Sequence, residues 1–439
     1  MHFFIHTLGC KINQYESQAL REAWLKDGHI EASEPEGANL ICLNGCAVTE
    51  RAVQEVRKTV RRLHRLNPKA ELVVTGCSAT VLVESQTELP EAVRLMPQEL
   101  KPALALLAIG REGLARQGEA HPLPDKSRFP ELSISKYPRA RPVLKVQDGC
   151  SRGCTYCIVP RTRGPASSRH PTAILAEAER LVRKGYGEIV LSGINLAQYS
   201  KARQGFRDFW DLVAWLDRRL AGSFGDILRL RLSSLDPAQL TDKALRVLAG
   251  SRLICPHLHL AIQSGSPRVL HEMGRSASSP EGVPDFLAGL SAIWPLFGLG
   301  GDILIGFPGE GSKDFSQTLD VVQELPFSYA HVFPFSPRPG TPAASRPDQI
   351  PDAVKKERSR RVRRIVQEKK NRFINRVVRE IDRLDVVLEG GDPAHGLCGL
   401  YLPCTFQPGA FPAGNGGVAP ARPRHAIENG LLVEALNQP

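Results

Sequence analysis

The sequence has 439 residues, too many for one hydrophobic core, so two or three domains are expected. Hydrophobic residues make up 42% of the chain, as in an ordinary globular protein. The longest apolar stretch, residues 102–110, is far too short to cross a bilayer, and no signal peptide is visible, so a cytoplasmic protein is expected. Lys and Arg number 57 against 46 Asp and Glu, and this excess of 11 positive charges favours a polyanionic partner.

Three short apolar runs near the amino terminus each end in a Gly-Cys pair. They cover residues 2–8, 39–44 and 71–75 and lead to Cys10, Cys46 and Cys77. Helical patterns over residues 14–26 and 48–65 separate the runs, and this alternation predicts a parallel sheet. Because ligands bind beyond the carboxyl ends of such strands, the three cysteines are expected to form a three-thiolate site. The alternative is three unrelated buried thiols, the interpretation that we favour for Cys42 inside the second run.

A second cysteine group follows a predicted strand at residues 142–147. Its thiols, Cys150, Cys154 and Cys157, are separated by three residues and then by two. Thiolates select zinc, copper(I) or iron–sulfur clusters, and a structural zinc ion requires a fourth ligand. Three thiolates suit a [4Fe-4S] cluster better, with one iron left open to a small molecule. Residues 112–141, rich in proline, glycine and charge, are expected to link the two cysteine segments.

Strand and helix patterns alternate after this loop and predict a partial barrel of about six βα units. The predicted helices cover residues 171–184, 206–220 and 237–249, and the predicted strands cover residues 188–192, 227–232, 257–262, 302–305 and 330–333. Polar or glycine-rich turns follow the strands at residues 193–196, 233–234, 263–266 and 306–309. These turns lie at the end of the barrel where active sites form. Each turn by itself is as typical of an ordinary connection between a strand and a helix as of an active site.

The last part of the chain combines a basic helix with a short β region. Residues 355–379 are densely basic, yet apolar residues recur through them at helical spacing. We expect this helix to pack by its apolar stripe and to present its basic face to nucleic acid; the alternative is a merely solvated face. Residues 383–389 and 431–435 are predicted strands around a segment rich in Pro, Gly and Ala at 406–423. The remaining cysteines, Cys255, Cys398 and Cys404, receive no role.

The cysteine motifs resemble those of known families. The C-x₃-C-x-aromatic-C spacing at residues 150–157 resembles the signature of radical S-adenosylmethionine (SAM) enzymes. The segments that surround the other three cysteines resemble the cysteine blocks of tRNA methylthiotransferases, a radical SAM family: residues 7–17 (TLGCKINQYES), 44–49 (NGCAVT) and 74–77 (VTGC). Residues 11–17 and 334–341 (PFSPRPGT) resemble the branch of that family that acts on N6-threonylcarbamoyladenosine.

The resemblance implies an α/β architecture in four parts. These are an amino-terminal parallel-sheet methylthiotransferase domain (1–128), a radical SAM core with a partial (β/α)6 barrel (135–345), a basic helix (346–382) and a small TRAM-like β region (383–439). Whether that last region closes into a barrel stays open. The resemblance also implies that Cys150, Cys154 and Cys157 hold a radical-generating [4Fe-4S] cluster. Cys10, Cys46 and Cys77 would hold an auxiliary [4Fe-4S] cluster that carries the sulfur to be inserted.

The implied reaction is methylthiolation at C2 of N6-threonylcarbamoyladenosine at position 37 of tRNA. One SAM methylates the sulfur, and a second yields a 5′-deoxyadenosyl radical that abstracts hydrogen from C2. The residues expected along SAM are Tyr156, Gly193 and Asn195. The implied partners are the anticodon arm of tRNA and a one-electron reductant such as flavodoxin or ferredoxin.

Four further residues and two other functions remain open. Arg163 and Arg338 either hold a substrate phosphate or carboxylate or are solvated on the surface. His257 and His259 alternate on one strand face, and a structural role is favoured over substrate contact. The alternative functions are the same reaction on N6-isopentenyladenosine, and a non-catalytic two-cluster electron-transfer and RNA-binding protein. Ferredoxin-like clusters have four thiolate ligands each, which argues against the second alternative.

Overall fold

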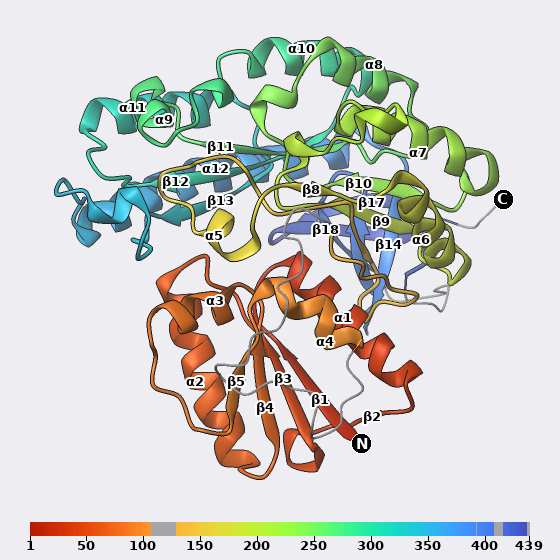
Figure 1. Ribbon diagram of the computed structural model, residues 1–439. Helices are drawn as coiled ribbons and strands as arrows, with labels where there is room; N and C mark the ends of the chain where they lie inside the picture. Colours follow the sequence, from red (N-terminus) through yellow and green to blue (C-terminus); the bar gives the residue numbers. More distant parts are fainter. Residues whose placement is uncertain (107–128, 392, 408–415, 437–439) are drawn as a thin grey trace. The chain divides into compact units, whose positions relative to one another are not determined.

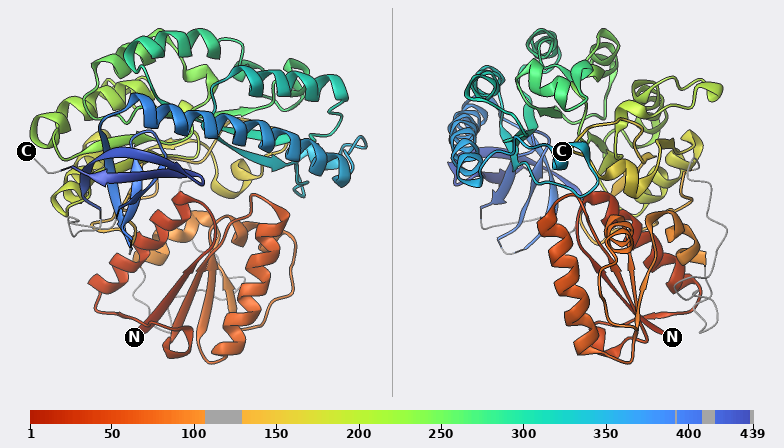
Figure 2. Two further views of the ribbon diagram at one scale, coloured as in Figure 1. Left: turned by 180° about the vertical axis from the view of Figure 1, so that it is seen from behind. Right: turned by 60° about the vertical axis from the view of Figure 1, so that its left-hand side comes forward.

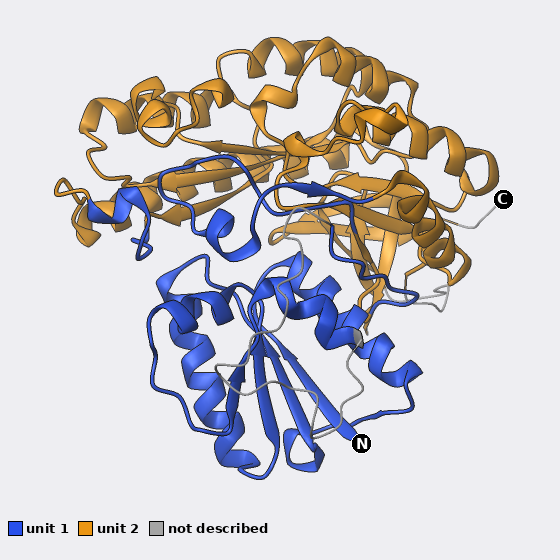
Figure 3. Ribbon diagram, viewed as in Figure 1, with its two compact units in different colours: residues 1–137, 145–169, 336–345 blue, residues 138–144, 170–335, 346–439 orange. Residues whose placement is uncertain are grey.

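The structure is a computed structural model that describes residues 1–106, 129–391, 393–407 and 416–436. The chain divides into two compact units, each assembled from segments distant in the sequence (Figure 3). Unit 1 comprises residues 1–137, 145–169 and 336–345, and unit 2 comprises residues 138–144, 170–335 and 346–439. Most of the predicted linker and the middle of the segment rich in Pro, Gly and Ala lie outside the described residues. Within the described ranges, no helix combines the length and apolarity needed to cross a membrane.

Unit 1 is built on a parallel sheet of five strands in the order β2-β1-β3-β4-β5. The strands are β1 (His2–Thr7), β2 (Ile30–Glu31), β3 (Leu40–Asn44), β4 (Glu71–Thr75) and β5 (Val93–Leu95). The three predicted strands, β1, β3 and β4, are confirmed. Their register places Thr7 opposite Asn44 and Asn44 opposite Thr75, so the three carboxyl ends are level. The sequence does not predict β2 and β5, because two or three residues are too few to show an alternating pattern.

Helices cover both faces of this sheet (Figures 1 and 2). On one face lie α1 (Lys11–Lys26) and α4 (Lys101–Leu106), and on the other lies α2 (Glu50–Leu66). The helix α2 begins two residues later than predicted because the Thr49 hydroxyl caps it, accepting the N–H of Ala52 at 3.2 Å. Its buried stripe, which packs into the core of the sheet, consists of Val53, Val56, Val60 and Leu63.

Unit 2 contains the predicted partial barrel. Its strands are β6 (Val143–Lys145), whose last residue belongs to unit 1, β9 (Glu188–Ser192), β10 (Arg229–Leu232), β11 (His257–Gln263), β12 (Gly298–Ile305) and β13 (Tyr329–Pro334). They form two three-stranded sheets, β10-β9-β6 and β11-β12-β13. Parallel bridges from Leu230 to Ile254 and from Leu235 to Leu260 join the two sheets, which gives six strands in succession.

The helices of unit 2 follow the strands. They are α6 (Pro171–Arg183), α7 (Phe209–Phe224), α8 (Asp242–Gly250), α9 (Pro267–Glu272), α10 (Val283–Ile293) and α11 (Ser312–Glu324). Capping side chains explain the shifted starts of two of them. The helix α7 begins three residues after its predicted start because Asp208 accepts the N–H of Asp211 at 3.1 Å. The helix α8 begins after a 3₁₀ turn at Pro237–Gln239 because Thr241 caps it.

The predicted basic helix is α12 (Asp352–Glu380), and a closed barrel follows it (Figure 2, left). Val362 and Val366 pack with residues of β12, β13 and α11, and Ile374 and Val377 pack into the core of the barrel. The barrel strands, in the order β14-β15-β16-β18-β17, are β14 (Leu384–Gly390), β15 (His395–Cys398), β16 (Pro403–Phe406), β17 (Val418–Ile427) and β18 (Gly430–Ala435). The question that the sequence left open is therefore answered, since the barrel is complete.

A buried carboxylate joins the two barrels of unit 2. Glu188, on β9, accepts hydrogen bonds from the Nε atoms of Arg229 and Arg231, each at 2.6 Å. The two guanidinium groups also donate to carbonyl oxygens of β15 and its turn, at Leu397 and Gly399. Burial opposes ionisation of Glu188, but Arg231 and Arg229 together lower its pKa to about 2.

We expect Glu188 to make unit 2 sensitive to acid. Its folded pKa of about 2 lies below the ordinary value of 4.5, so the ionised group favours the folded state by on the order of 3 kcal/mol. This contribution is complete above about pH 4.5 and is lost as the pH falls toward 2. Glu188→Gln should lower stability at pH 7 and flatten the acid dependence, measured by denaturant unfolding. Glu179→Gln, which removes the carboxylate that pairs with the exposed Arg183, is the control. An unchanged acid dependence in Glu188→Gln would refute the assignment.

Candidate active site

The first cysteine group lies where the sequence places it. Cys10, Cys46 and Cys77 come directly after β1, β3 and β4, whose carboxyl ends are level. Because β2 and β3 lie on opposite sides of β1, the boundary between β1 and β3 is a topological switch point, where open α/β sheets bind ligands. Burial raises the pKa of Cys46 to about 11; the Val48 amide opposes this shift, and Cys77 and Cys10 add to it. Cys46 therefore lies within electrostatic reach of both Cys77 and Cys10.

Glycines allow the loops of the first group to approach each other. A Cβ on Gly9, whose φ is +121°, would lie 2.6 Å from the Cβ of Cys46. A Cβ on Gly45 would lie 2.1 Å from the Oγ of Ser78. Any side chain at these two positions would push the cysteine loops apart, so the glycines form a cradle that suits a bulky metal cluster.

The second cysteine group forms a curled loop in the same unit. Cys150, Cys154 and Cys157 lie between β7 (Gln147–Asp148) and α5 (Val159–Arg163), and all three are half-buried. The Cys157 N–H donates to the Cys154 carbonyl at 3.0 Å, and the Cys150 N–H donates to the Gly164 carbonyl at 3.0 Å. Both bonds turn the backbone back on itself, so the three cysteines are presented by one compact loop.

Two elements of unit 1 bring the cysteine groups together. The helix α5, which begins just after Cys157, packs on α3 (Cys77–Glu84), which begins at the last cysteine of the first group. The segment of residues 336–345 contacts the second cysteine loop and the start of α2, which follows Cys46: the Ala343 N–H donates to the Thr155 carbonyl at 2.9 Å, and the Ser336 Oγ accepts the Glu50 N–H at 3.3 Å. The two three-thiol groups are therefore neighbours within one compact unit.

A buried network of charges lies beside the first cysteine group. Glu16, on α1, accepts hydrogen bonds from Lys101 Nζ at 2.6 Å, Lys145 Nζ at 2.7 Å and Arg163 Nη1 at 2.9 Å. Asp148 accepts from Lys145 at 2.5 Å and from Arg163 at 2.9 Å. These five side chains are at most 4% exposed. Sequence reasoning missed the network because Lys, Glu, Asp and Arg are rarely buried and no local pattern marks an exception.

For Arg163 the structure contradicts both expected roles, and for Arg338 it leaves only the binding of a phosphate or carboxylate. Arg163 is not solvated, and it is not available to a substrate, because all three of its nitrogens bind residues of unit 1. Arg338 is also buried, so surface solvation is wrong for it as well. Its Nη1 pairs with Glu50 at 2.8 Å, while its Nε and Nη2 have no partner among the described residues. Two unsatisfied buried donors leave Arg338 suited to an anionic group.

The residues expected along SAM are divided between the units. Tyr156 lies in the second cysteine loop of unit 1 and is half-buried, whereas Gly193 and Asn195 lie in the turn after β9 in unit 2. The side chain of Asn195 accepts the N–H of Ala197 at 3.2 Å and thereby caps the 3₁₀ turn at Leu196–Gln198. The role of all three residues toward SAM stays a prediction.

The histidines of β11 belong to a hydrogen-bonded network on the barrel strands. The hydroxyl of Tyr329 lies 2.9 Å from His257 Nε2 and 2.9 Å from His259 Nδ1. Asp302 lies 3.1 Å from His259 and 3.2 Å from His331. These mutual contacts support the structural role favoured for His257 and His259. The roles of Asp302, Tyr329 and His331 could not be predicted, although their strands were, because pairing between strands is not visible in the sequence.

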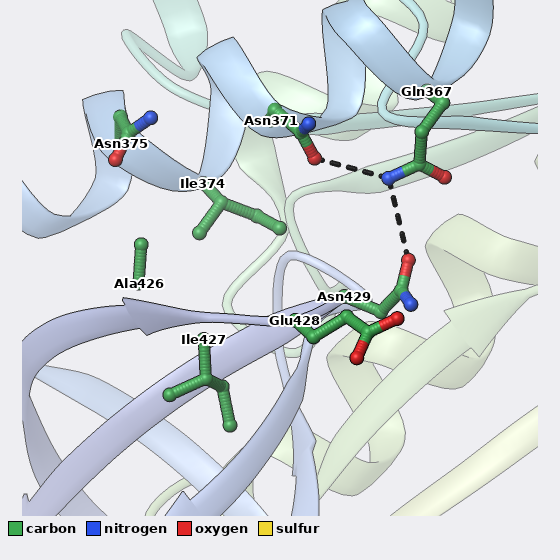
Figure 4. A pocket seen from close by; sticks show the side chains of 8 residues that line it. All are labelled: Gln367, Asn371, Ile374, Asn375, Ala426, Ile427, Glu428 and Asn429. Carbon is green, nitrogen blue, oxygen red and sulfur yellow. Dashed lines mark hydrogen bonds between the residues drawn. The ribbon is translucent and has the colours of Figure 1, made fainter. Parts of the chain in front are cut away.

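A groove in unit 2 lies between α12 and the turn that joins β17 to β18 (Figure 4). Its volume is about 530 Å³, and its lining consists of Gln367, Asn371, Ile374, Asn375, Ala426, Ile427, Glu428 and Asn429. Gln367 Nε2 donates to the Oδ1 atoms of Asn371 at 3.0 Å and of Asn429 at 3.3 Å. Amide side chains thus dominate a groove beside the basic helix.

Family models define the class of this chain, and a solved structure shares its fold. Residues 2–96 match the Uncharacterized protein family UPF0004, and residues 144–322 match the Radical SAM superfamily. The structure of the radical SAM methyltransferase TsrM from Kitasatospora setae is similar with a TM-score of 0.55, over 78% of this chain and 77% of that chain. Its sequence identity of 16% supports the fold alone. The chain is a radical SAM protein that carries a UPF0004 amino-terminal domain.

Curated relatives define the family more closely. The threonylcarbamoyladenosine tRNA methylthiotransferase MtaB of Bacillus subtilis is 35% identical over 81% of this chain and 78% of its own length. The MtaB proteins of Thermotoga maritima and Chlamydia pneumoniae are 35% and 36% identical over 81% and 82% of this chain, and over 79% and 80% of their own lengths. This chain belongs to the MtaB family of radical SAM tRNA methylthiotransferases. Membership implies SAM and two [4Fe-4S] clusters as cofactors, and the two neighbouring three-thiol groups suit them.

Proposed function

We propose that this protein methylthiolates C2 of N6-threonylcarbamoyladenosine in tRNA. The observation that carries the proposal is the pair of three-thiol groups in one compact unit, in a chain whose MtaB relatives carry that substrate in their names. Three thiolates leave one iron of a [4Fe-4S] cluster without a protein ligand. Two such groups therefore provide two open irons, whereas a pair of electron-carrying clusters would have four thiolates each.

The residues divide the chemistry between the two groups. Cys150, Cys154 and Cys157 would hold the SAM-binding cluster, and Cys10, Cys46 and Cys77 would hold the sulfur-carrying cluster. When bound, these clusters supply the radical and the sulfur that an unactivated aromatic C–H requires. The chain positions the clusters, orients SAM and excludes water from the radical. Tyr156, Gly193 and Asn195 are proposed to line SAM, and the two unsatisfied donors of Arg338 are proposed to bind a carboxylate or phosphate.

The basic face of α12 and the amide-lined groove beside it are proposed to bind the anticodon arm of tRNA. Spacings of three or four residues align exposed basic side chains in two groups along the helix, Lys356, Arg360 and Arg364 and then Arg372, Arg376 and Arg379. Phosphate contacts by such residues supply affinity, and amide side chains can hydrogen-bond to base edges. Because tRNA is used in the cytoplasm, the proposal places the protein there, with flavodoxin or ferredoxin as the one-electron reductant.

Neutralising part of the basic face is expected to weaken tRNA binding. Lys356, Arg364, Arg372 and Arg379 are exposed on the helix surface. Changing all four to Gln should reduce affinity at least about tenfold and make the dependence on salt shallower by up to about four units of slope. Filter binding of tRNA at several salt concentrations measures both effects.

The control for this experiment changes four exposed basic residues on other elements of unit 2, namely Lys184, Arg203, Arg207 and Arg218. Equal losses in the two quadruple variants would mean that only net charge matters and that α12 is not the binding face. Both variants should remain folded, because exposed charges that make few contacts contribute little to stability.

The proposed function is tested by mass spectrometry of tRNA nucleosides from a strain that lacks the gene. Loss of the methylthio group from the threonylcarbamoyl nucleoside alone, restored by the gene on a plasmid, is the expected result. Loss from only the isopentenyl nucleoside would assign the sister reaction instead. Unchanged nucleosides, together with failure of the purified protein to form 5′-deoxyadenosine, would favour the electron-transfer alternative.

A further inference from the structure

Arg163 makes a hydrogen bond to one of the cysteines of the first group. Its Nε donates to Cys77 Sγ at 3.2 Å. Its Nη1 donates to Glu16 and Asp148 at 2.9 Å each, and its Nη2 donates to the Oδ1 of Asn13 at 2.8 Å. Four residues therefore fix the plane of the guanidinium, and the Nε–H is aimed at the sulfur.

The charges of the surrounding network do not balance. The contacts join three cations, Lys101, Lys145 and Arg163, to two carboxylates, Glu16 and Asp148, which leaves one positive charge in excess. An uncompensated charge in a protein interior is strongly unfavourable. The Cys77 Sγ, which accepts the Arg163 Nε–H, lies directly beside this excess positive charge.

We propose that Arg163 is a positioning residue that fixes Cys77 and raises the reduction potential of the auxiliary cluster. This inference rests on the proposed assignment of Cys10, Cys46 and Cys77 as ligands of that cluster. Hydrogen bonds to ligand sulfurs and nearby positive charge stabilise the more negative, reduced form of an iron–sulfur cluster. Arg163 supplies both, whereas Arg161 on the same short helix binds Glu84 and the Pro339 carbonyl and does not contact Cys77.

The test uses the full chain with Cys150, Cys154 and Cys157 changed to Ala, so that any cluster formed belongs to the first group. This parent is reconstituted anaerobically with iron and sulfide, and its cluster is titrated under electron paramagnetic resonance. Three changes are compared in it: Arg163→Lys, the pair Arg163→Met with Glu16→Gln, and Glu16→Gln alone. Arg161→Lys is the matched control. Iron and sulfide content and circular dichroism are measured for each protein.

The direction of each shift follows from the charges. Arg163→Lys keeps the charge but loses the fixed Nε–H, and the pair keeps the excess of one positive charge while removing the donor. Both variants should lower the ratio of reduced to oxidised cluster about tenfold at a fixed solution potential. A tenfold change in this ratio corresponds to a shift of about 59 mV in the one-electron reduction potential. Glu16→Gln alone removes a negative charge and should shift the ratio in the opposite direction. Arg161→Lys should leave it unchanged.

Two results would overturn the inference. The first is an unchanged ratio in both Arg163 variants. The second is a shift of the same sign in all three network variants, which is expected if Arg163 merely supports the fold. If either Arg163 variant fails to fold, the sign of the shift in the other variant decides between the two explanations. A parent protein that binds no iron at all would instead contradict the proposed function, so the two failures are distinguishable.

Discussion

Replacing Cys150, Cys154 and Cys157 with alanine is expected to abolish the cleavage of SAM to 5′-deoxyadenosine, and with it all methylthiolation. Alanine offers no ligand atom to iron, and the curled loop contributes all three proposed thiolates of the SAM-binding cluster. Replacing Cys10, Cys46 and Cys77 should instead preserve SAM cleavage and abolish only the transfer of the methylthio group. Anaerobic assays that quantify 5′-deoxyadenosine and the modified nucleoside in the same reaction separate the two outcomes.

Cys42→Ala is the control for these substitutions. Cys42 lies on β3, four residues before Cys46, and burial raises its pKa to about 12, so it stays a neutral thiol in the core. Both reactions should persist in this variant. The division of roles would be refuted if the triple variants lost SAM cleavage to the same extent while each still bound half of the iron of the unmodified protein.

The largest loss of stability is expected from Glu16→Ala, at about 3–5 kcal/mol of unfolding free energy. Removing this carboxylate leaves Lys101, Lys145 and Arg163 buried with only Asp148 as a counter-charge. Denaturant unfolding followed by circular dichroism measures the loss. Glu22→Ala is the matched control on the same helix. Glu22 accepts hydrogen bonds from neutral groups, namely the backbone N–H groups of Ser135 and Lys136 and the side-chain amide of Gln18.

The same residue should contribute to the acid sensitivity of unit 1. Burial opposes ionisation of Glu16, but Arg163, Lys101 and Lys145 hold its pKa well below the usual value of 4.5. Its stabilising effect is therefore complete above about pH 4.5 and declines as the pH falls below that value. Glu16→Gln should remove this share of the pH dependence. An acid-unfolding curve with the same slope in Glu16→Gln and in the unmodified protein would contradict the assignment.

Local signals explain why both cysteine groups could be predicted from the sequence. Cys10, Cys46 and Cys77 each follow an apolar run and a glycine, and the rule for parallel sheets then brings them to one edge. The spacing of Cys150, Cys154 and Cys157 is set within eight residues of chain. The apolar stripe of α12 and the strands of the partial barrel could also be predicted from the sequence, because their hydrophobic patterns extend over many residues.

The features that the sequence did not predict depend on contacts between distant segments. The partners of Arg163 come from α1, α3 and the strand before the cysteine loop, and nothing near Arg163 in the sequence distinguishes them from solvated residues. The barrel after α12 was uncertain because Pro420 and Pro423 lie in β17, where proline is unusual. That strand tolerates Pro423 because it pairs irregularly with β18, with a register shift between Pro423 and His425.

The discontinuity of unit 1 has a consequence for biogenesis. Its first segment emerges from the ribosome with Glu16 and Lys101 already present, but Lys145, Asp148 and Arg163 are made later, and the segment at 336–345 much later still. A nascent chain that ends before residue 145 lacks two of the three cations that surround Glu16. The compact form of this unit must therefore wait until most of the polypeptide has been translated.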